Sequence, residues 1–564
     1  MRIFLCHTRG MFIRTKTTPN SPRQSIQIVE GYRDKTGKVK QRIVHHVGIA
    51  RDEDECIKLK AYGEELIVKI KAERQGPGLF DNLPLQPRPG RPKAKRLEDI
   101  LPPSKVKLDE VVEESRLTEG IHEIAGKLYD DLGFNEVLAR GHKNTLKEMV
   151  LMRLAHPTSK RASCLMLEEQ FGKEISLERV YRMMDQLELV IPKVQKLVRA
   201  SSLRLLNDKI DILLFDVTTL YFESVDVDDL RKFGYSKDQK YHCVQVVLAL
   251  ATTGDGLPIG YELFEGNFAE VQTLQRCLVS WKEQGLEIGS VCLAGDSAMF
   301  SKGNLALMEE MGISYVVAAP LRKLSKEFKA EILKDEDYRL GLVEKDILWS
   351  KEIPYGANRL IVSYSATRAR KDMGDRERLL DKLHKKLGEK KNVKNLVSNR
   401  GYLKYIKEDE KTVCALNEAK IEQEKLWDGM HGIVTNAPKE EQALALLHRY
   451  RRLWKIEESF RINKHTLRMR PIYHFKDWRV KAHIAICYMS FALMRHLEYR
   501  IKIAQKKLSP QEILSALNSV QASILVHKKT GDRYRMPSSL KKEARLIYKT
   551  FGIQRSQNVE IYLP

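Results

Sequence analysis

The chain has 564 residues, of which 43% are hydrophobic, so it can bury a sizeable core and wholesale disorder is excluded. Its 98 Lys and Arg residues outnumber 75 Asp and Glu residues, which gives a formal net charge of +23 and a pI near 9.4. Such an excess attracts polyanions, of which nucleic acid is the commonest, although a ribosome-associated or merely basic protein could carry the same charge.

The eight cysteines contain no C-x-x-C pair, so neither a zinc finger nor a disulfide framework is indicated. No convincing signal peptide begins the chain, and Met11 opens a sequence that looks like a natural start. The most apolar helix expected, Ile484–Met494, is too short to span a bilayer. We therefore expect a cytoplasmic, nucleoid-associated protein with no membrane partner.

The first elements expected along the chain are a β-hairpin at Ser25–Gly48 and a helix at Glu53–Glu73. Gln75–Lys105 is rich in Pro, Gly and basic residues, which is typical of a linker. Val106–Asn207 then has a helical pattern throughout.

Two helices joined by a glycine inside this region resemble a helix-turn-helix. They are expected at Lys160–Phe171 and Leu177–Leu187, with Ser176 as N-cap of the second. The second helix displays Arg179 and Arg182, which could contact DNA. A DNA-reading role and a plain packing role are equally open, because helix pairs joined by glycine are common.

From Lys209 onward, dense apolar runs indicate buried strands. Five strands are expected, at Ile210–Val217, Tyr241–Ala251, Ile259–Phe264, Ser290–Gly295 and Ser314–Ala319. Helices are expected at Glu270–Trp281, with Asn267 as N-cap, and at Asn304–Met311. The order is three strands, helix, strand, helix, strand.

Pro320–Asn436 reads as a β-rich insertion, with a strand at Arg359–Ser365 and a basic helix near Arg376–Leu387. After it, Glu440–Arg468 is expected to be one long helix. The units expected are 1–75 (hairpin and helix, binding DNA ends), 76–105 (basic linker), 106–207 (helical, with the helix-turn-helix), 208–319 (first part of an α/β core), 320–436 (insertion), 437–500 (second part of the core) and 501–564 (a C-terminal helical region).

Asp216 and Asp296 each end one of the buried apolar runs. A charge at that position is costly unless it is paired or bound to a metal. The ends of neighbouring parallel strands can also meet at one sheet edge. Each aspartate alone could simply cap a following helix. Two in the same setting favour a site for two divalent ions about 3.5–4 Å apart, as phosphodiester chemistry uses.

A third carboxylate comes from the expected long helix. Tyr450, Glu457 and Lys464 are spaced by seven residues, or two helical turns, so they share one face. Arg461 lies beside them and could instead form a plain surface pair with Glu457. Glu458 points about 100° away and is the less suitable ligand.

Three short motifs therefore stand in a fixed order: FDVTTLYF around Asp216, D-x-A-x-F from Asp296, and the Tyr, Glu and Lys spaced by seven. Together they resemble the DDE transposases of insertion sequences, specifically the branch with the Y-R-E-K signature, the insertion-sequence-four superfamily. The resemblance covers most of Met11–Glu498. One departure is Leu453, which stands where the signature has Arg, so that Arg451, Arg452 or Arg461 could serve instead.

The resemblance implies an RNase H-like α/β fold with a β-rich insertion before the glutamate helix. It implies Asp216, Asp296 and Glu457 as catalytic residues that hold two Mg²⁺ ions, for which Mn²⁺ can substitute. The implied reaction is nicking at a transposon end, followed by attack of the freed 3′-OH on another phosphodiester. The implied partners are double-stranded DNA with terminal inverted repeats, target DNA, and a second copy of the chain in a synaptic homodimer.

The resemblance also implies that Tyr450 and Lys464 contact the element-end DNA. Further basic residues expected at DNA are Arg179, Arg182, Arg368, Arg370, Lys371, Arg452 and Arg461. Two other hypotheses stay open: a different RNase H-like nuclease or resolvase, and an inactive DNA-binding remnant of a transposase. A tyrosine recombinase is disfavoured, because no Arg/His constellation accompanies Tyr450.

Overall fold

The computed structural model describes residues 11–17, 24–33, 38–50, 53–74, 107–236, 240–286, 291–388, 405–407, 415–504 and 508–562. The expected basic linker, 76–105, and Met1–Gly10 lie outside the described residues.

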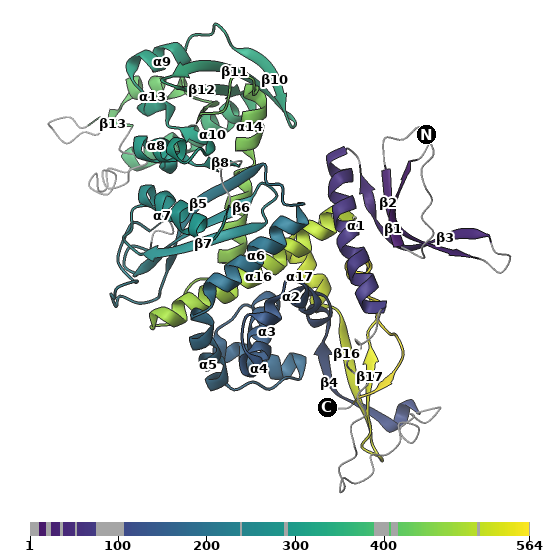
Figure 1. Ribbon diagram of the computed structural model, residues 1–564. Coiled ribbons are helices and arrows are strands. Elements are labelled where there is room, and N and C mark those ends of the chain that lie inside the picture. The colour runs from purple at the N-terminus through teal and green to yellow at the C-terminus, as the bar shows by residue number, and fades with distance from the viewer. Residues whose placement is uncertain are drawn as a thin grey trace.

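A nine-stranded mixed sheet runs through the upper half of the molecule in the order β10-β11-β12-β15-β9-β8-β5-β6-β7 (Figure 1). Its strands are β5 Ile212–Tyr221, β6 Gln245–Thr253, β7 Pro258–Glu265, β8 Cys292–Gly295, β9 Ser314–Ala319, β10 Arg339–Val343, β11 Asp346–Tyr355, β12 Asn358–Ser365 and β15 Met430–Thr435. Along β7-β6-β5-β8-β9, the first three strands are antiparallel neighbours, and β8 and β9 run parallel to β5. This topology confirms the predicted RNase H-like core.

Strand β5 differs from the prediction in one respect that matters for the site. It continues to Tyr221, so Asp216 lies inside the strand and not at its end. The reason is asymmetric pairing: β6 accompanies β5 from Leu213 to Tyr221, whereas β8 stops pairing at Phe215. Asp216 therefore follows the last residue that has a parallel neighbour.

The insertion is β-rich, as predicted, and its strands extend the core sheet. Strand β15 pairs antiparallel with both β9 and β12, which joins the two parts edge to edge. Its other elements are α9 Lys326–Ile332, α10 Ala366–Gly388, α13 Glu418–Lys425 and the short strands β13 Ile406–Lys407 and β14 Ala415–Leu416. The basic helix is thus α10, longer than predicted because it starts directly after β12.

Helices α7 Glu270–Glu283 and α8 Lys302–Glu310 pack on one face of the core sheet, where Trp281 meets Phe215. The predicted Asn267 cap is wrong: α7 has Ala269 at its N-cap, without a side-chain hydrogen bond, because the chain is still extended at Ala269.

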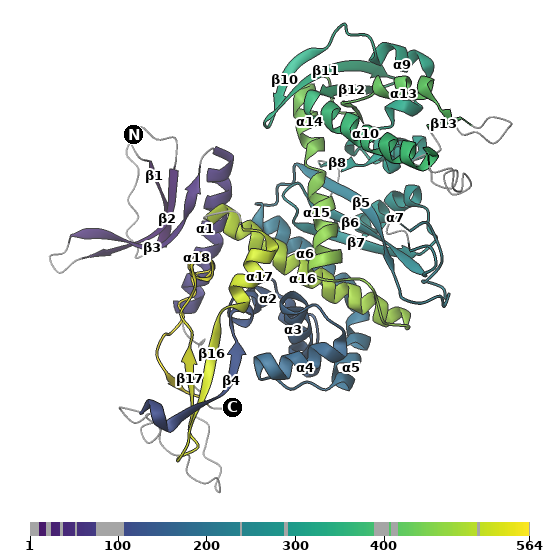
Figure 2. The ribbon, with the colours of Figure 1, turned by 180° about the vertical axis from the view of Figure 1, so that it is seen from behind.

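The opposite face carries the segment expected to be one long helix, and that prediction is wrong as well. The segment forms α14 Ala443–Arg451, α15 Trp454–Arg461 and the π-helical turn η7 Ile462–Thr466. It has to change partners on the way, because α14 contacts β8–β11 whereas α15 contacts β5 and β6 (Figure 2). Leu453 is buried at the break between the two helices.

Below the core lies a helical unit made of α2 Gly126–Asp131, α3 Arg140–Ala155, α4 Lys160–Phe171, α5 Leu177–Glu188 and α6 Ile191–Leu205. It packs against the long helix α16, Asp477–Ala504, whose apolar residues are nearly all buried. The two helices of the predicted helix-turn-helix are confirmed. Gly172 ends α4 at φ +64°, and the Ser176 hydroxyl accepts a hydrogen bond from the Arg179 backbone N–H at 3.3 Å.

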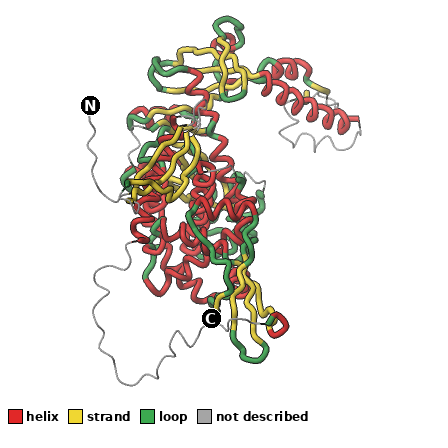
Figure 3. Tube along the Cα trace, turned by 90° about the vertical axis from the view of Figure 1, so that its right-hand side faces the viewer, coloured by secondary structure: helices red, strands yellow, loops and turns green. Residues whose placement is uncertain are grey.

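Residues 106–207 are not wholly helical, however, and neither is the C-terminal region. Strand β4, Val111–Thr118, pairs antiparallel with β16, Gln521–His527. The C-terminal elements are α17 Pro510–Asn518, β16, β17 Arg533–Pro537, α18 Lys542–Thr550 and β18 Glu560–Ile561. This four-stranded sheet brings β4 together with the C-terminal strands, roughly 400 residues away in the sequence. No local sequence pattern therefore predicted it. It lies at the opposite end of the molecule from the insertion (Figure 3).

The N-terminal hairpin and helix are confirmed as β2 Gln24–Arg33, β3 Val39–Ala50 and α1 Glu53–Arg74. A further strand, β1 Met11–Thr17, adds to β2 and makes a three-stranded antiparallel sheet.

Candidate active site

Asp216 lies inside β5, and Asp296 directly follows β8, the parallel neighbour of β5. The parallel register pairs Phe215 with Gly295, so the two aspartates, one residue further on, are at the same level. Neighbouring strands lie about 5 Å apart. Both side chains are half-buried. The register, extended by one residue, agrees with the predicted juxtaposition of the two carboxylates.

The face to which Asp216 points follows from the alternation of side chains along a strand. Leu214 and Leu220 share its face, and both belong to the hydrophobic cluster that contains Ile456 and Phe460 of α15. The Asp216 carboxylate is therefore on the side of the sheet that α15 covers.

Asp296 also caps the helix that follows it, which was the alternative interpretation of this residue. Its Oδ1 accepts a hydrogen bond from the Ala298 backbone N–H at 2.8 Å and caps the short 3-10 helix η5, Ser297–Met299. The Asp216 Oδ1 accepts from the Val217 N–H at 2.7 Å. A carboxylate has two oxygens and about four acceptor positions. Capping and metal ligation are therefore compatible.

The two adjacent glutamates of α15 have opposite environments. Glu457 is exposed, and no residue in the described part of the chain forms a hydrogen bond or ion pair with it. The Glu458 carboxylate pairs with Lys455 at 2.8 Å and with the buried Arg495 at 2.9 Å. Arg461 also faces Glu458, at 3.8 Å. The expected alternative, a surface pair between Arg461 and Glu457, is therefore wrong.

Tyr450, at the end of α14, is a side chain whose pKa is affected by all three acidic residues. Burial raises the pKa of its phenol well above the ordinary value, and the negative charge of Asp296 adds to this effect. Glu457 and Asp216 raise the same pKa further, whereas the charge of Arg368 lowers it. The Coulomb energy between two charges falls as their separation grows. All three predicted carboxylates thus influence the pKa of one side chain.

The three carboxylates do not form a closed ligand set as they stand. Within the described residues, no group of three or more His, Cys, Asp or Glu side chains is placed to hold a metal ion. The donor chemistry fits a hard divalent cation, which prefers carboxylate oxygens. Two of the donors are fixed by strands, and the third is on an exposed, unpaired side chain.

A cavity of about 460 Å³ adjoins Tyr450, between β12, α10 and β15. Arg368, Lys371 and His431 line it. The His431 ring contacts that of Tyr450 at 4.8 Å, and burial, with the charges of Arg368 and Arg451, lowers the pKa of His431 to about 4. His431 is therefore neutral at physiological pH and leaves the positive charge to the flanking arginines.

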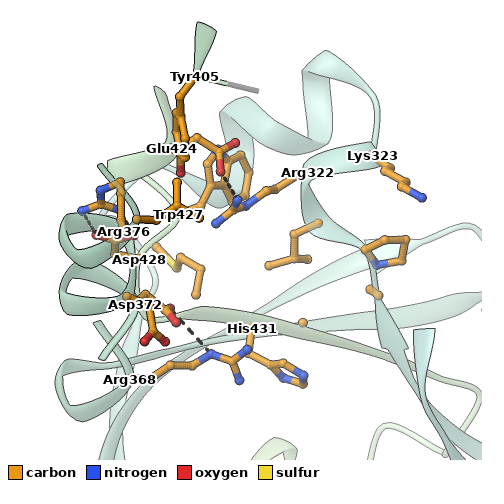
Figure 4. A pocket seen from close by; sticks show the side chains of 17 residues that line it. Arg322, Lys323, Arg368, Asp372, Arg376, Tyr405, Glu424, Trp427, Asp428 and His431 are labelled. Atoms are coloured by element: carbon orange, nitrogen blue, oxygen red, sulfur yellow. Dashed lines mark hydrogen bonds and ion pairs between the residues drawn. The ribbon is translucent and has the colours of Figure 1, made fainter. Parts of the chain in front are cut away.

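A second cavity of about 550 Å³ continues from the first, because Arg368, Asp372 and His431 line both (Figure 4). In Figure 4, Arg368 faces Asp372, at 3.8 Å, and Arg376 faces Asp428. Two of the predicted DNA contacts, Arg368 and Lys371, thus lie at the candidate site. Arg370 is exposed on the same helix and bonds the carbonyl of Ala366.

The three candidates for the missing signature arginine are in different situations. Arg451 bonds Asp346 at 2.6 Å and the carbonyl of Val343 at 3.1 Å. Arg452 pairs with Asp211, just before β5, and bonds the carbonyl of Gly254 at 3.3 Å. Both tie the helix break to the sheet. Arg461, with 71% of its side chain exposed, is the one whose charge faces solvent.

Three further residues predicted to contact DNA lie in η7 and on α5. Lys464 is half-buried in η7, where the π-helical turn changes the angle that seven-residue spacing would give. Arg179 and Arg182 are exposed on α5 in the helical unit, away from the residues around Tyr450. Sequence reasoning missed Arg495 and His431. A lone charge inside the apolar stretch of α16 was the available signal for Arg495.

Residues 207–493 match the family model described as Transposase DDE domain, and residues 13–76 match that described as IS1634 family transposase, N-terminal domain. The chain belongs to the DDE transposases, and its N-terminal part is similar to that of the IS1634 family. A solved structure with a similar arrangement is the cryo-EM structure of a piggyBac transposase synaptic complex with hairpin DNA. It is 10% identical with a TM-score of 0.36, over 71% of this chain and 77% of that one.

No curated protein matches the transposase significantly. In its described residues, no helix combines the length and apolarity that crossing a membrane would require.

Proposed function

We propose that this transposase cleaves the ends of its element and joins them to target DNA in cut-and-paste transposition, with Asp216, Asp296 and Glu457 as the catalytic residues. The observation that carries the proposal is the convergence of these three charges on Tyr450. The strand register that sets Asp216 beside Asp296 supports it independently.

Asp216, Asp296 and Glu457 would hold two Mg²⁺ ions, with Mn²⁺ as a substitute. When bound, such ions activate the attacking oxygen and neutralise charge on the phosphate. The aspartates are held by the backbone of β5 and β8. Glu457 is exposed and unpaired among the described residues, so its side chain can swing toward the aspartates when DNA arrives.

Tyr450 serves as a hydrogen-bond donor to DNA in this scheme. Because its pKa is raised, the phenol keeps its proton at every physiological pH, which suits donation to a phosphate oxygen and not nucleophilic attack. Arg368 and Lys371, across the cavity, would bind neighbouring phosphates as cations. Together with Lys464, these residues support the proposed assignment to the Y-R-E-K branch, and Arg461 is the most exposed of the candidates for the absent signature arginine.

The DNA partner we propose is the terminal inverted repeat of the element, bound as a synaptic homodimer. The N-terminal sheet and α1, which fall in the matched IS1634 N-terminal domain, are the unit we assign to end binding. The cationic excess of the whole chain supports binding of target DNA as well.

The test uses a duplex that carries the sequence flanking the coding region. Asp216→Asn, Asp296→Asn and Glu457→Gln should each abolish Mg²⁺-dependent nicking while leaving DNA binding in EDTA intact. Glu310→Gln, which neutralises an exposed glutamate on α8, is the matched control and should nick normally.

Full nicking by any of the three variants would remove that residue from the site. Binding without nicking by the wild-type chain would identify an inactive remnant. Preference for branched DNA over element ends would identify a resolvase-like nuclease.

A further inference from the structure

A cavity of about 440 Å³ lies in the helical unit, at the N-terminus of α4 and against the segment that leads into α16. Its charged lining is cationic: Arg153, Lys160, Arg161, Arg468 and Arg470. Two histidines complete the polar wall, and none of the described residues that line it is acidic. The described lining of this cavity thus holds five cations and no carboxylate.

Lys160 is the most unusual of these cations. Its side chain is only 5% exposed, yet it forms no hydrogen bond or ion pair with any residue that the structure describes. Burial, and then the charge of Arg153, lowers the pKa of its ammonium group to about 7. A buried ammonium group without a partner is costly, so a fold retains it where something outside the chain supplies the missing charge.

Arg153 repeats the pattern. It is 4% exposed, and among the described residues its guanidinium reaches only the carbonyl of Leu467, at 3.5 Å, while its Nε has no partner there. Helix α4 also begins at this wall, with Ser159 at its N-cap. The first backbone N–H groups of a helix and its dipole favour an anion at that end. Three independent features therefore point to an anion in the same cavity.

We propose that this cavity binds a backbone phosphate of double-stranded DNA, at a distance from the carboxylate site. The inference rests on the proposed function only in taking DNA as the source of the phosphate. Its position fits a duplex that also reaches the carboxylates, because Arg470 donates a hydrogen bond to the hydroxyl of Tyr221 at 3.4 Å. Tyr221 and Asp216 are the last and a middle residue of β5.

The spacing along β5 gives the expected position on DNA. Five residues of strand span roughly 17 Å, at about 3.3 Å per residue. Duplex DNA rises about 3.4 Å per base pair. The phosphate in the cavity is therefore expected several base pairs from the scissile one. Tyr473, which lines the cavity and is 63% exposed, can lie against the adjoining sugar.

The test measures DNA binding in EDTA, where no cleavage occurs. Lys160→Met keeps the methylene stem and removes the charge; Arg161→Gln neutralises an exposed cation of the same cavity. Lys196→Met, an exposed lysine on α6, is the matched control. Fluorescence anisotropy of a labelled duplex, titrated at several salt concentrations, gives affinity and the slope of log K against log salt.

Lys160→Met should weaken binding on the order of tenfold and reduce the salt slope by about one phosphate contact. It should not lower the thermal unfolding midpoint, because it removes a buried charge that has no partner in the fold. Arg161→Gln should change affinity and slope in the same direction, and Lys196→Met should change neither.

Equal affinity and slope for Lys160→Met and Lys196→Met would overturn the proposal. So would a thermal stabilisation by inorganic phosphate that Lys160→Met abolishes while its DNA affinity stays normal, because the pocket would then take a free anion. Failure of nicking by the wild-type chain bears only on the carboxylate site, since this measurement needs no cleavage.

Discussion

Substitution of the two adjacent glutamates of α15 should lower the stability of the protein in one case and abolish its DNA cleavage in the other. Glu458→Ala removes the carboxylate that pairs with Lys455 and Arg495, and Glu457→Ala removes an exposed one that has no described partner. We expect the first variant to be destabilised yet able to nick DNA, and the second to be stable yet inactive.

The magnitude follows from what each change leaves behind. Arg495 is 3% exposed and, without Glu458, keeps only Glu498, at 3.0 Å, as a countercharge. Breaking a buried pair in this way costs about 3 kcal/mol. Such a loss lowers the unfolding midpoint of a core unit by roughly 6–12 °C. Removal of an exposed side chain such as Glu457 changes stability by about 0.5 kcal/mol or less.

The pKa of Glu458 determines how the stabilisation by this carboxylate depends on pH. Burial opposes ionisation, but the hydrogen bond from Lys455 and the charge of Arg495 outweigh it and hold this pKa below the ordinary 4.5. The stabilisation is therefore present above the pKa of the unfolded chain and is lost as pH falls through the lower, folded pKa. Glu458→Ala should flatten the acid limb of the stability curve.

The assay combines thermal unfolding with Mn²⁺-dependent nicking of a flank-sequence duplex, at a temperature where both variants are folded. The reasoning is refuted if Glu457→Ala unfolds as early as Glu458→Ala. It is equally refuted if folded Glu458→Ala cannot nick.

Three further predictions concern the surroundings of Tyr450 and the metal. His431 has a folded pKa of about 4 against 6.5 in the unfolded chain, so the unfolded chain takes up the proton first. Stability should therefore fall by up to about 1.4 kcal/mol per pH unit as pH drops from 6.5 toward 4, and His431→Gln should lose less over that range in a pH series of unfolding midpoints. Arg376→Met removes the partner of the Asp428 carboxylate, which is 14% exposed and pairs with Arg376 at 2.5 Å. The variant should lose about 3–5 kcal/mol of stability in thermal or urea unfolding, and a loss near zero would mean that the pair adds no stability. EDTA should abolish nicking and Mn²⁺ should restore it, with gel-shift affinity for the duplex unchanged; nicking in EDTA would exclude a metal-dependent mechanism.

Most of the core could be predicted because its signals are local. The apolar runs around Phe215 and Leu293 marked central strands, and Gly172 and Ser176 marked the ends of two helices. Asp216 and Asp296 could be singled out because each is a charge that follows such a run. Their juxtaposition needed only the rule that neighbouring parallel strands end at one edge.

The errors arose where long-range packing decides the local structure. The long helix breaks at Leu453 because one half packs on β8–β11 and the other on β5–β6. Strand β4 exists only through its pairing with β16 at the other end of the chain. Nothing near Asn267 shows that this residue lies in a turn and that an extended Ala269 directly precedes the helix.

The sequence by itself determined the order of strands and helices in the first part of the core, the identity of the acidic residues, and the cationic excess that suits DNA. Periodicity and composition are properties of the chain, and they hold before folding. Only the tertiary structure decided which of two neighbouring glutamates is committed to Arg495 and which faces solvent. It also placed Lys160 in a cavity whose described lining is cationic and contains no carboxylate. Charge pairing depends on separations of a few ångströms between residues remote in sequence, and folding alone sets those separations.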